Sequence, residues 1–291
     1  MNYSPLRYPG GKSKLAPLID KIINNTGSIC NTYIEPFAGG AGVALTLLLS
    51  NKVRQIVIND YDKAIYSFWR SLKEETNELI NLIKKTPLSI VEWKKQRNIY
   101  INENKKYSLK LGFAAFYLNR TNRSGVLTGG VIGGLEQNSN YSIDARYNKT
   151  DLISRIEKIA ERKCDIKIYN KEIRSFITNI IPKYQKDGFV YFDPPYYNKG
   201  KCLYKNFFIP KDHAEIANLI INKVKCDWVI TYDNVPQIKE LFQAYSMREL
   251  LLRYHITNNR NLGEELLILK KNKYYHAKSQ LHYKAFGGLN V

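Results

Sequence analysis

The residues best suited to chemistry are a run of four, Asp193-Pro194-Pro195-Tyr196, directly after the apolar segment Phe189 to Phe192. Each proline fixes φ and lacks an N–H, so the pair holds carbonyl oxygens rigidly at the end of the predicted strand. The Asp193 carboxylate and a proline carbonyl then form two acceptors that match an amino group with two hydrogens. Tyr196 adds a flat ring on which a base can stack.

Such a site suits methylation of an exocyclic amine, whose lone pair is delocalised into the ring and is a poor nucleophile. Two acceptors favour the pyramidal nitrogen and stabilise the positive charge that develops on it. Alignment of methyl donor and amine contributes the rest. We therefore take Asp193, Pro194 and Tyr196 as candidate catalytic residues, with a plain strand-end turn as the alternative.

A glycine-rich turn, Glu35 to Gly42, is a candidate for holding the methyl donor. It joins a predicted strand at 31–37 to a predicted helix at 43–49. A strand, a glycine turn and a helix in this order aim backbone N–H groups and the positive helix end at a ligand. A turn needed only for packing is the alternative.

The residues around this turn favour a nucleoside without phosphates, such as S-adenosylmethionine. Asp60 follows the predicted strand 55–58, where a carboxylate can accept hydrogen bonds from ribose hydroxyls. Leu45 stands where a dinucleotide-binding turn has its third glycine. Another turn, Pro9 to Ser13, lacks the first glycine of a P-loop, so Lys12 is better placed to meet a carboxylate, such as the amino-acid end of the same cofactor.

These residues need a sheet to position them. Apolar runs that end at turn residues predict five strands, and strands that alternate with helical patterns predict βαβ units. The fold class is therefore α/β, with a mostly parallel Rossmann-like sheet and helices on both faces. The predicted strands are 31–37, 55–58, 188–192, 227–231 and 265–269, and the predicted helices are 43–49 and 211–224.

The middle of the chain has a different pattern, helical and polar and then rich in Gly and Asn. We predict an inserted, mainly helical subdomain over 61–150, which carries a basic, glycine-rich loop between 118 and 134. A long loop in a compact chain is usually functional or disordered. The catalytic domain then comprises 1–60 and 151–291.

Composition indicates a folded protein with a polyanionic partner. The 291 residues contain 45 Lys+Arg and 26 Asp+Glu, a formal net charge of +19, with 44% hydrophobic residues. Nucleic acid is the first candidate partner, and a lysine-rich surface without such a partner is the alternative. The four cysteines lack metal-ligand spacing, so no metal is expected. No apolar run reaches the roughly 20 residues of a membrane span, and no signal peptide is visible, so we expect a cytoplasmic protein without a membrane partner.

Taken in order, these motifs resemble those of the Dam-type, α-group DNA adenine methyltransferases over most of the chain. The resemblance implies a class I methyltransferase sheet, S-adenosylmethionine as cofactor and adenine in duplex DNA as substrate. A restriction endonuclease of matching specificity is then a candidate partner, unless the enzyme is solitary or phage-borne. The oligomeric state is not predicted, although a monomer fits. The motifs are Leu6 to Lys12, Glu35 to Gly42, Asn59-Asp60, Leu118 to Arg120, Asp193 to Tyr196 and Glu264 to Ile268.

The same resemblance assigns roles residue by residue. The first motif has Tyr8-Pro9 where many members have Trp-Ala. The resemblance places Tyr8 and Lys12 beside the methionine part of the cofactor and makes Phe37 and Gly39 part of its cradle. It assigns the ribose to Asp60 and places Tyr169 and Asn170 near the adenine of the cofactor. Asp193 then borders both the cofactor and the target base.

The inserted subdomain is then the part that recognises DNA. An amino group paired in a duplex cannot reach Asp193, so the target base must leave the stack. Asn119, Arg120, Asn122 and Arg123 are of the types that pair with guanine and adenine edges in the major groove. Two alternatives remain: methylation of adenine in RNA or of the exocyclic amine of cytosine, and a non-catalytic nucleic-acid-binding protein.

Overall fold

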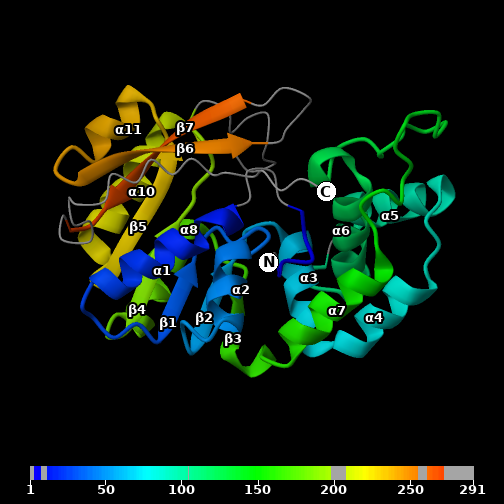
Figure 1. Ribbon diagram of the computed structural model, residues 1–291, viewed down its shortest axis with the longest axis horizontal. Helices are drawn as coiled ribbons and strands as arrows, with labels where there is room; N and C mark the ends of the chain where they lie inside the picture. The colour runs from blue at the N-terminus through cyan, green and yellow to red at the C-terminus, as the bar shows by residue number, and fades with distance from the viewer. Residues whose placement is uncertain (1–2, 8–11, 104, 198–207, 255–260, 272–291) are drawn as a thin grey trace, which may run out of the picture. The chain divides into compact units, whose positions relative to one another are not determined.

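The computed structural model describes residues 3–7, 12–103, 105–197, 208–254 and 261–271, with side chains described through Leu250 and again from Glu265 (Figure 1). The chain divides into two compact units, and each is considered by itself. The first contains Met1–Pro17 and Asn31–Ile173, and the second contains Leu18–Cys30 and Arg174–Val291.

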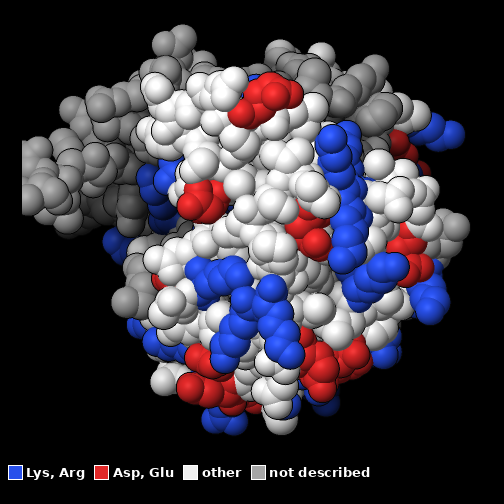
Figure 2. All heavy atoms as spheres, turned by 90° about the vertical axis from the view of Figure 1, so that its right-hand side faces the viewer, with Lys and Arg blue, Asp and Glu red and all other residues white. Residues whose placement is uncertain are grey.

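Charged side chains of both signs share the surface. On the face drawn in Figure 2, Lys and Arg gather in patches that have Asp and Glu beside them. A net charge of +19 therefore does not appear on this face as an unbroken basic field. Oppositely charged neighbours weaken the potential that a distant phosphate experiences, because their fields cancel beyond a few ångströms.

Within its described residues, the first unit contains three parallel strands in the order β3-β2-β1. β1 (Thr32–Glu35) and β2 (Gln55–Asn59) pair with Glu35 opposite Ile58, and β3 (Ile166–Tyr169) pairs with β2 so that Asn59 lies opposite Tyr169. Because the strands are parallel, their carboxyl ends lie at one edge of this part of the sheet. The residues that follow each strand are thereby brought together.

Helices make up most of the first unit. α2 follows β1, and α3, α5 and α6 pack together, with the rings of Phe68 and Phe116 stacked at a centroid separation of 5.6 Å. Nearly every residue of α6 is buried, so it is the core helix of this group. The elements are η1 (Lys12–Leu15), α2 (Gly42–Leu49), α3 (Lys63–Glu74), α4 (Thr76–Lys85), α5 (Ile90–Asn102), α6 (Leu109–Thr121), η2 (Arg123–Gly125), α7 (Lys149–Ala160) and η3 (Lys163–Asp165).

α3 and α6 approach each other closely at Gly112. A Cβ added at Gly112 would lie 2.6 Å from the backbone oxygen of Ser67 and 2.8 Å from the hydroxyl of Ser71. No side chain fits at such distances, so the sequence needs glycine here even though glycine weakens a helix.

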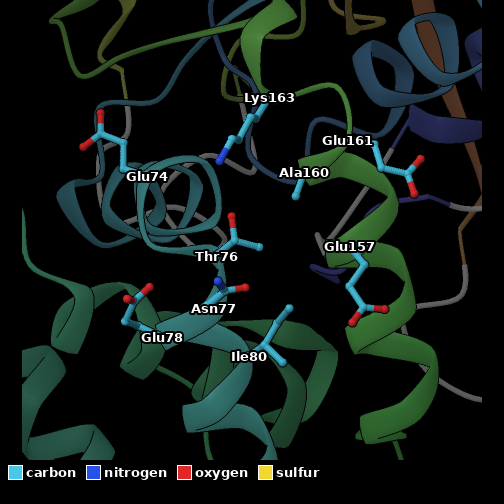
Figure 3. Close-up of a pocket in the computed structure, with 9 residues that line it drawn as sticks. All are labelled: Glu74, Thr76, Asn77, Glu78, Ile80, Glu157, Ala160, Glu161 and Lys163. Carbon is cyan, nitrogen blue, oxygen red and sulfur yellow. The ribbon is translucent and has the colours of Figure 1, made fainter.

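A pocket of about 490 Å³ lies on the first unit, where α4 and α7 pack against each other (Figure 3). Four glutamates and one lysine are among its lining residues, so its charge repels phosphate and carboxylate groups. None of the residues that line the pocket belongs to the glycine turn or to the tetrad. Its lining residues are Glu74, Thr76, Asn77, Glu78, Ile80, Glu157, Ala160, Glu161 and Lys163.

The other four strands described by the structure belong to the second unit. β4 (Gly188–Phe192) and β5 (Asp227–Asp233) are parallel, while β7 (Asn261–Leu269) is antiparallel to both β5 and β6 (Ser246–Tyr254). Aromatic and β-branched residues dominate β4 and β5, as expected of strands buried on both faces. The helical elements are α1 (Ala16–Asn25), α8 (Ile173–Asn179), η4 (Ile181–Tyr184), α10 (Pro210–Lys223) and α11 (Pro236–Leu241).

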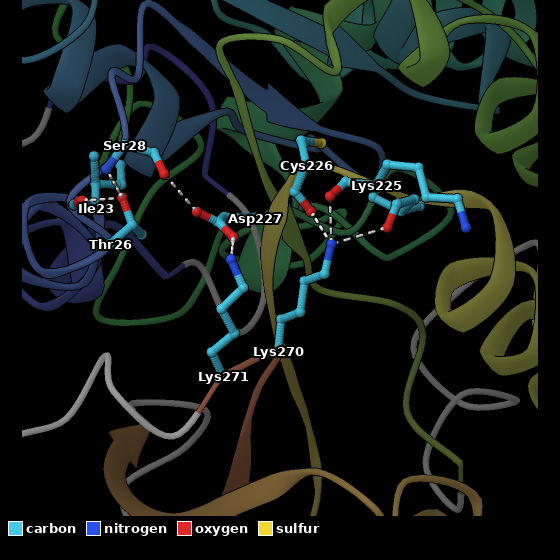
Figure 4. Close-up of polar contacts among 9 residues, drawn as sticks. Ile23, Thr26, Ser28, Lys225, Cys226, Asp227, Lys270 and Lys271 are labelled. Atoms are coloured by element: carbon cyan, nitrogen blue, oxygen red, sulfur yellow. Dashed lines mark hydrogen bonds and ion pairs between the residues drawn. The ribbon is translucent and has the colours of Figure 1, made fainter.

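Two lysines after β7 stabilise the amino end of β5 (Figure 4). The Nζ of Lys270 donates to three successive backbone carbonyls, those of residues 224, 225 and 226, at 3.2, 2.5 and 2.7 Å. Lys271 forms an ion pair with Asp227 at 2.9 Å, and Ser28 donates to the same carboxylate. These contacts lie at the opposite end of the parallel strands from the tetrad.

The structure confirms the predicted α/β class. Among the residues that the structure describes, seven strands form one mixed sheet in the order β3-β2-β1-β4-β5-β7-β6. Each of the five predicted strands is present, and so are the predicted helices at 43–49 and 211–224, as α2 and α10. β3 and β6 were not among the predicted strands. In the described part of the chain, no helix combines the length and apolar character needed to cross a membrane.

Helices α3 to α6 belong to the same compact unit as β1, β2 and β3. The predicted boundaries of the inserted subdomain at 61–150 rest on its sequence pattern, helical and polar and then rich in Gly and Asn, and not on compactness. They stay a prediction.

Candidate functional site

In the first unit, the glycine turn is anchored from both sides. The buried side chain of Glu35, at the end of β1, accepts hydrogen bonds from the backbone N–H of Ala44 at 2.9 Å and from the hydroxyl of Tyr33. The carboxylate thereby caps the amino end of α2, whose first N–H groups have no partner within the helix. Glu35 thus has a structural role that its motif alone does not reveal.

The turn itself is shaped by residues with positive φ. Gly39 and Ala41 have φ values of 47° and 49°, a left-handed conformation that is unusual for alanine. The indole of Trp69 donates to the Gly39 carbonyl at 2.9 Å, and the Gly39 N–H donates to Asp60 at the same distance. Gly42 is required for another reason: its Cβ would lie 2.9 Å from the Cβ of Ser13.

Asp60 lies just beyond β2, beside the turn. One carboxylate oxygen accepts the N–H of Gly39 and the other accepts the N–H of Asp62, each at 2.9 Å. Burial, reinforced by the negative charge of Asp62, raises the pKa of the Asp60 carboxyl to about 7. Each oxygen has a second lone pair, so this carboxylate can accept further hydrogen bonds from a pair of hydroxyl groups.

Asn59 and Asn170 hold the ends of β2 and β3 together. The Asn59 amide donates to the carbonyls of Pro36 and Lys171 and accepts the N–H of Lys171. The Asn170 amide donates to the carbonyls of Asp60 and of the next residue, at 2.8 and 3.0 Å. Asn170 therefore supports the loop that carries Asp60, which is a role beyond the predicted contact with adenine.

The remaining predicted cofactor residues are placed as follows. Phe37 is half-buried at the start of the turn, Lys12 is buried at the first position of η1, and Tyr169 ends β3 half-buried. Tyr8 lies outside the described residues. η1 packs against α2, so Lys12 is held in the same unit as the glycine turn.

In the second unit, the tetrad begins directly after β4. Asp193 is half-buried, and its Oδ1 accepts the hydroxyl of Thr231 at 2.8 Å. That hydroxyl in turn lies 2.8 Å from the hydroxyl of Tyr191. Two side chains, one from β4 and one from β5, thereby orient the carboxylate.

Further bonds hold the rest of the tetrad. The hydroxyl of Tyr196 donates to the carboxylate of Glu265 at 2.8 Å, and the N–H of Tyr197 donates to Asp233 at 2.9 Å. Thr231 and Asp233 were not among the predicted site residues. The alternation of β5 is the signal that could have found them, because residues two apart share one face of a strand.

The four residues that were predicted to contact DNA fall into two pairs, two asparagines and two arginines. The side chains of Asn119 and Asn122 are fully buried, and both amides bond to backbone groups of residues 7, 125, 126 and 127. Asn122 also accepts the indole N–H of Trp93 at 2.7 Å. A side chain so enclosed does not reach a base edge, so we reassign both asparagines from DNA contact to support of the fold.

Arg120 and Arg123 remain candidates for DNA contact. Arg123 is exposed, and Arg120 is half-buried with an Nε that has no hydrogen-bond partner among the described residues. Burial, followed by the charges of Arg7 and Arg155, lowers the pKa of Arg120 to about 10. A cation that burial and like charges destabilise in this way gains from a nearby anion.

Comparisons with known proteins agree with the motifs. The sequence model of the D12 class N6 adenine-specific DNA methyltransferase family matches residues 8–256. The type II methyltransferase M.MjaIII of Methanocaldococcus jannaschii is 26% identical over 207 residues, which are 66% of this chain and 68% of that protein. The type II methyltransferase M.CviBI of Paramecium bursaria Chlorella virus NC1A is 25% identical over 274 residues, 90% of this chain and 95% of that protein.

Among solved structures, the rRNA methyltransferase AviRa of Streptomyces viridochromogenes matches with a TM-score of 0.40 and 12% identity, over 90% of this chain and 86% of that one. The family match, by contrast, spans the glycine turn, Asp60 and the tetrad in a single stretch.

Proposed function

The chain belongs to the D12 class N6 adenine-specific DNA methyltransferase family, and we propose that it uses S-adenosylmethionine to methylate the 6-amino group of adenine at a specific site in duplex DNA. M.MjaIII and M.CviBI are both named type II methyltransferases, which supports the further proposal that this chain is the modification enzyme of a restriction-modification system. The observation that carries the proposal is the orientation of Asp193 by Thr231 at the end of β4.

The residues of the first unit fit the cofactor. Asp60 offers its second lone pairs to the ribose hydroxyls, and the glycine turn keeps side chains away from the nucleoside. The ammonium group of Lys12 pairs with the carboxylate in the amino-acid part of the cofactor. When bound, S-adenosylmethionine supplies an electrophilic methyl group.

The residues of the second unit act on the adenine. The base leaves the duplex and stacks on Tyr196, whose hydroxyl is fixed by Glu265. The Asp193 carboxylate and the carbonyl of Pro194 accept the two amino hydrogens. The negative charge of the carboxylate and the dipole of the carbonyl would stabilise the ammonium character of the nitrogen as it takes the methyl group and the methyl–sulfur bond breaks. The Asp193 carboxylate would then accept the surplus proton of the methylated nitrogen, with S-adenosylhomocysteine as the leaving group. Thr231 keeps the carboxylate turned toward the amine.

Transfer of a labelled methyl group tests the proposal. Purified protein with S-adenosyl-[methyl-³H]methionine and mixed-sequence duplex DNA is expected to label DNA, and digestion is expected to release the label as N6-methyl-2′-deoxyadenosine. Sequencing of the modified DNA then gives the recognition site. Label in RNA only, or in N4-methylcytosine, would contradict the proposal.

The pKa of Asp60 predicts a pH dependence of cofactor binding. Because the ionised carboxylate is the better acceptor for ribose hydroxyls, and its pKa is about 7, the binding-competent fraction rises as the pH rises from 6 to 8. The affinity for S-adenosylhomocysteine is expected to increase about tenfold over this range. Calorimetric titration at both pH values measures it.

The Asp60→Asn variant is the control for this prediction. Asparagine has no titrating group, so the variant is expected to bind more weakly at pH 8 and to lose the pH dependence. An equal increase in affinity in wild type and variant would show that another group titrates.

A further inference from the structure

The loop predicted between 118 and 134 begins later in the structure, because residues 118–121 belong to α6, and the recognition loop is therefore taken as residues 122–134. The amino-terminal segment Tyr3–Arg7 lies between this loop and the glycine turn. The side-chain amide of Asn119 accepts the backbone N–H of Arg7 at 2.7 Å and donates to the backbone carbonyl of Arg7 at 2.6 Å. It thus forms the two hydrogen bonds that a residue of a neighbouring strand would form. The same amide donates to the carbonyl of Gly125 at 2.9 Å. One buried side chain therefore joins the segment to the first residues of the loop.

Gly125 makes the junction tight. Its φ is +75°, and a Cβ at this position would lie 2.5 Å from the carbonyl oxygen of Arg7. The guanidinium of Arg7 also donates to the carbonyl of Asn122 at 3.3 Å. The loop thus cannot shift away from or toward the segment without breaking these bonds or making a clash.

The other end of the segment contacts the glycine turn. The hydroxyl of Ser4 donates to the carbonyl of Gly40 at 2.5 Å, and Arg155 on α7 donates to the carbonyl of Ser4 at 3.1 Å. Gly40 follows Gly39, whose N–H is bound by Asp60. Hydrogen bonds therefore join the recognition loop through Asn119 to Arg7, at one end of the segment, and join Ser4, at its other end, to the cofactor turn. Between these two ends the connection is the short backbone itself, in which the Ser4 hydroxyl accepts the N–H of Leu6 at 3.2 Å.

From these contacts we infer that Asn119 and Gly125 are positioning residues that couple cofactor binding to the order of the recognition loop. The inference rests on the proposed cofactor site. A ligand that fixes the glycine turn also fixes the segment, and the segment fixes the loop that meets the DNA. By linkage, an ordered loop favours cofactor binding by the same factor.

Hydrogen exchange measured with and without S-adenosylhomocysteine tests the coupling. In the wild type, saturating ligand is expected to slow exchange of the amides in residues 123–134 by about fivefold or more. In Asn119→Asp, which loses both donors, and in Gly125→Ala, which makes the clash, ligand still binds but this slowing is expected to be lost. Gly125→Ala keeps the test decisive if Asn119→Asp does not fold.

Gly130→Ala is the matched control, because it lies on the same loop and a Cβ there meets nothing within 4 Å. It is expected to behave as the wild type. If ligand binds the wild type without slowing exchange in the loop, or slows it equally in Gly125→Ala, the coupling is overturned while the proposed function stands. If the wild type does not bind S-adenosylhomocysteine, the cofactor proposal and the coupling fall together.

Discussion

Asp193→Asn is expected to lower the single-turnover rate of methyl transfer by about 10²–10³-fold, without loss of DNA binding. Asparagine keeps the size of the side chain, and its oxygen still accepts the Thr231 hydroxyl. It removes the negative charge that stabilises the developing ammonium and presents an NH₂ group where an acceptor is needed. Rapid-quench measurement with labelled cofactor gives the rate, and filter binding gives the DNA affinity.

The control for this variant is Asp187→Asn. Asp187 lies directly before β4, at the opposite end of the same strand, so the substitution makes the same chemical change in the same unit. It is expected to leave the rate unchanged. Equal activity of Asp193→Asn and the wild type would show that methyl transfer does not need the carboxylate of Asp193.

Gly112→Ala is expected to destabilise the protein by about 2 kcal/mol or more, the upper part of the range for overpacked cores. Helix propensity alone points the other way, because alanine stabilises a helix interior by about 1 kcal/mol relative to glycine. The added carbon would lie 2.6 Å from a backbone oxygen of α3, and backbone cannot rotate aside as a side chain can. Packing therefore outweighs propensity here, and the midpoint of urea unfolding should fall.

Gly130→Ala is the corresponding control, since its new carbon meets open space. Its urea midpoint is expected to match that of the wild type or exceed it slightly. A midpoint of Gly112→Ala at or above that of the wild type would show that α3 and α6 separate without cost.

The sequence was most informative where local chemistry determines local structure. The buried strands and the turns that end them were predicted at Glu35 to Gly42 and at Asp193 to Tyr196, because apolar runs, glycines and prolines act within a few residues. β6 was not predicted, since Ser246–Tyr254 alternates only weakly and contains charged residues. β3 is four residues long, with one exposed lysine, and its pattern is too short to recognise.

Side-chain roles that depend on distant partners were harder to predict. Asn119 has the type of side chain that recognises adenine, and only its burial against Arg7, 112 residues earlier in the chain, shows that it supports the fold. Thr231 was also missed as a partner of Asp193, because its significance comes from the pairing of β4 and β5. Residue type and spacing predict which chemistry is available, and tertiary contacts determine which residues perform it.

The lysines that end the sheet also affect how the protein should respond to ionic strength. Lys270 and Lys271 neutralise carbonyl dipoles and a carboxylate within the protein, and Lys149 likewise donates to the carbonyls of Lys84 and Thr86. Such cations displace few counterions from a DNA backbone. These three lysines should therefore contribute little to the slope of log affinity against log salt concentration, although each is counted in the formal charge of +19.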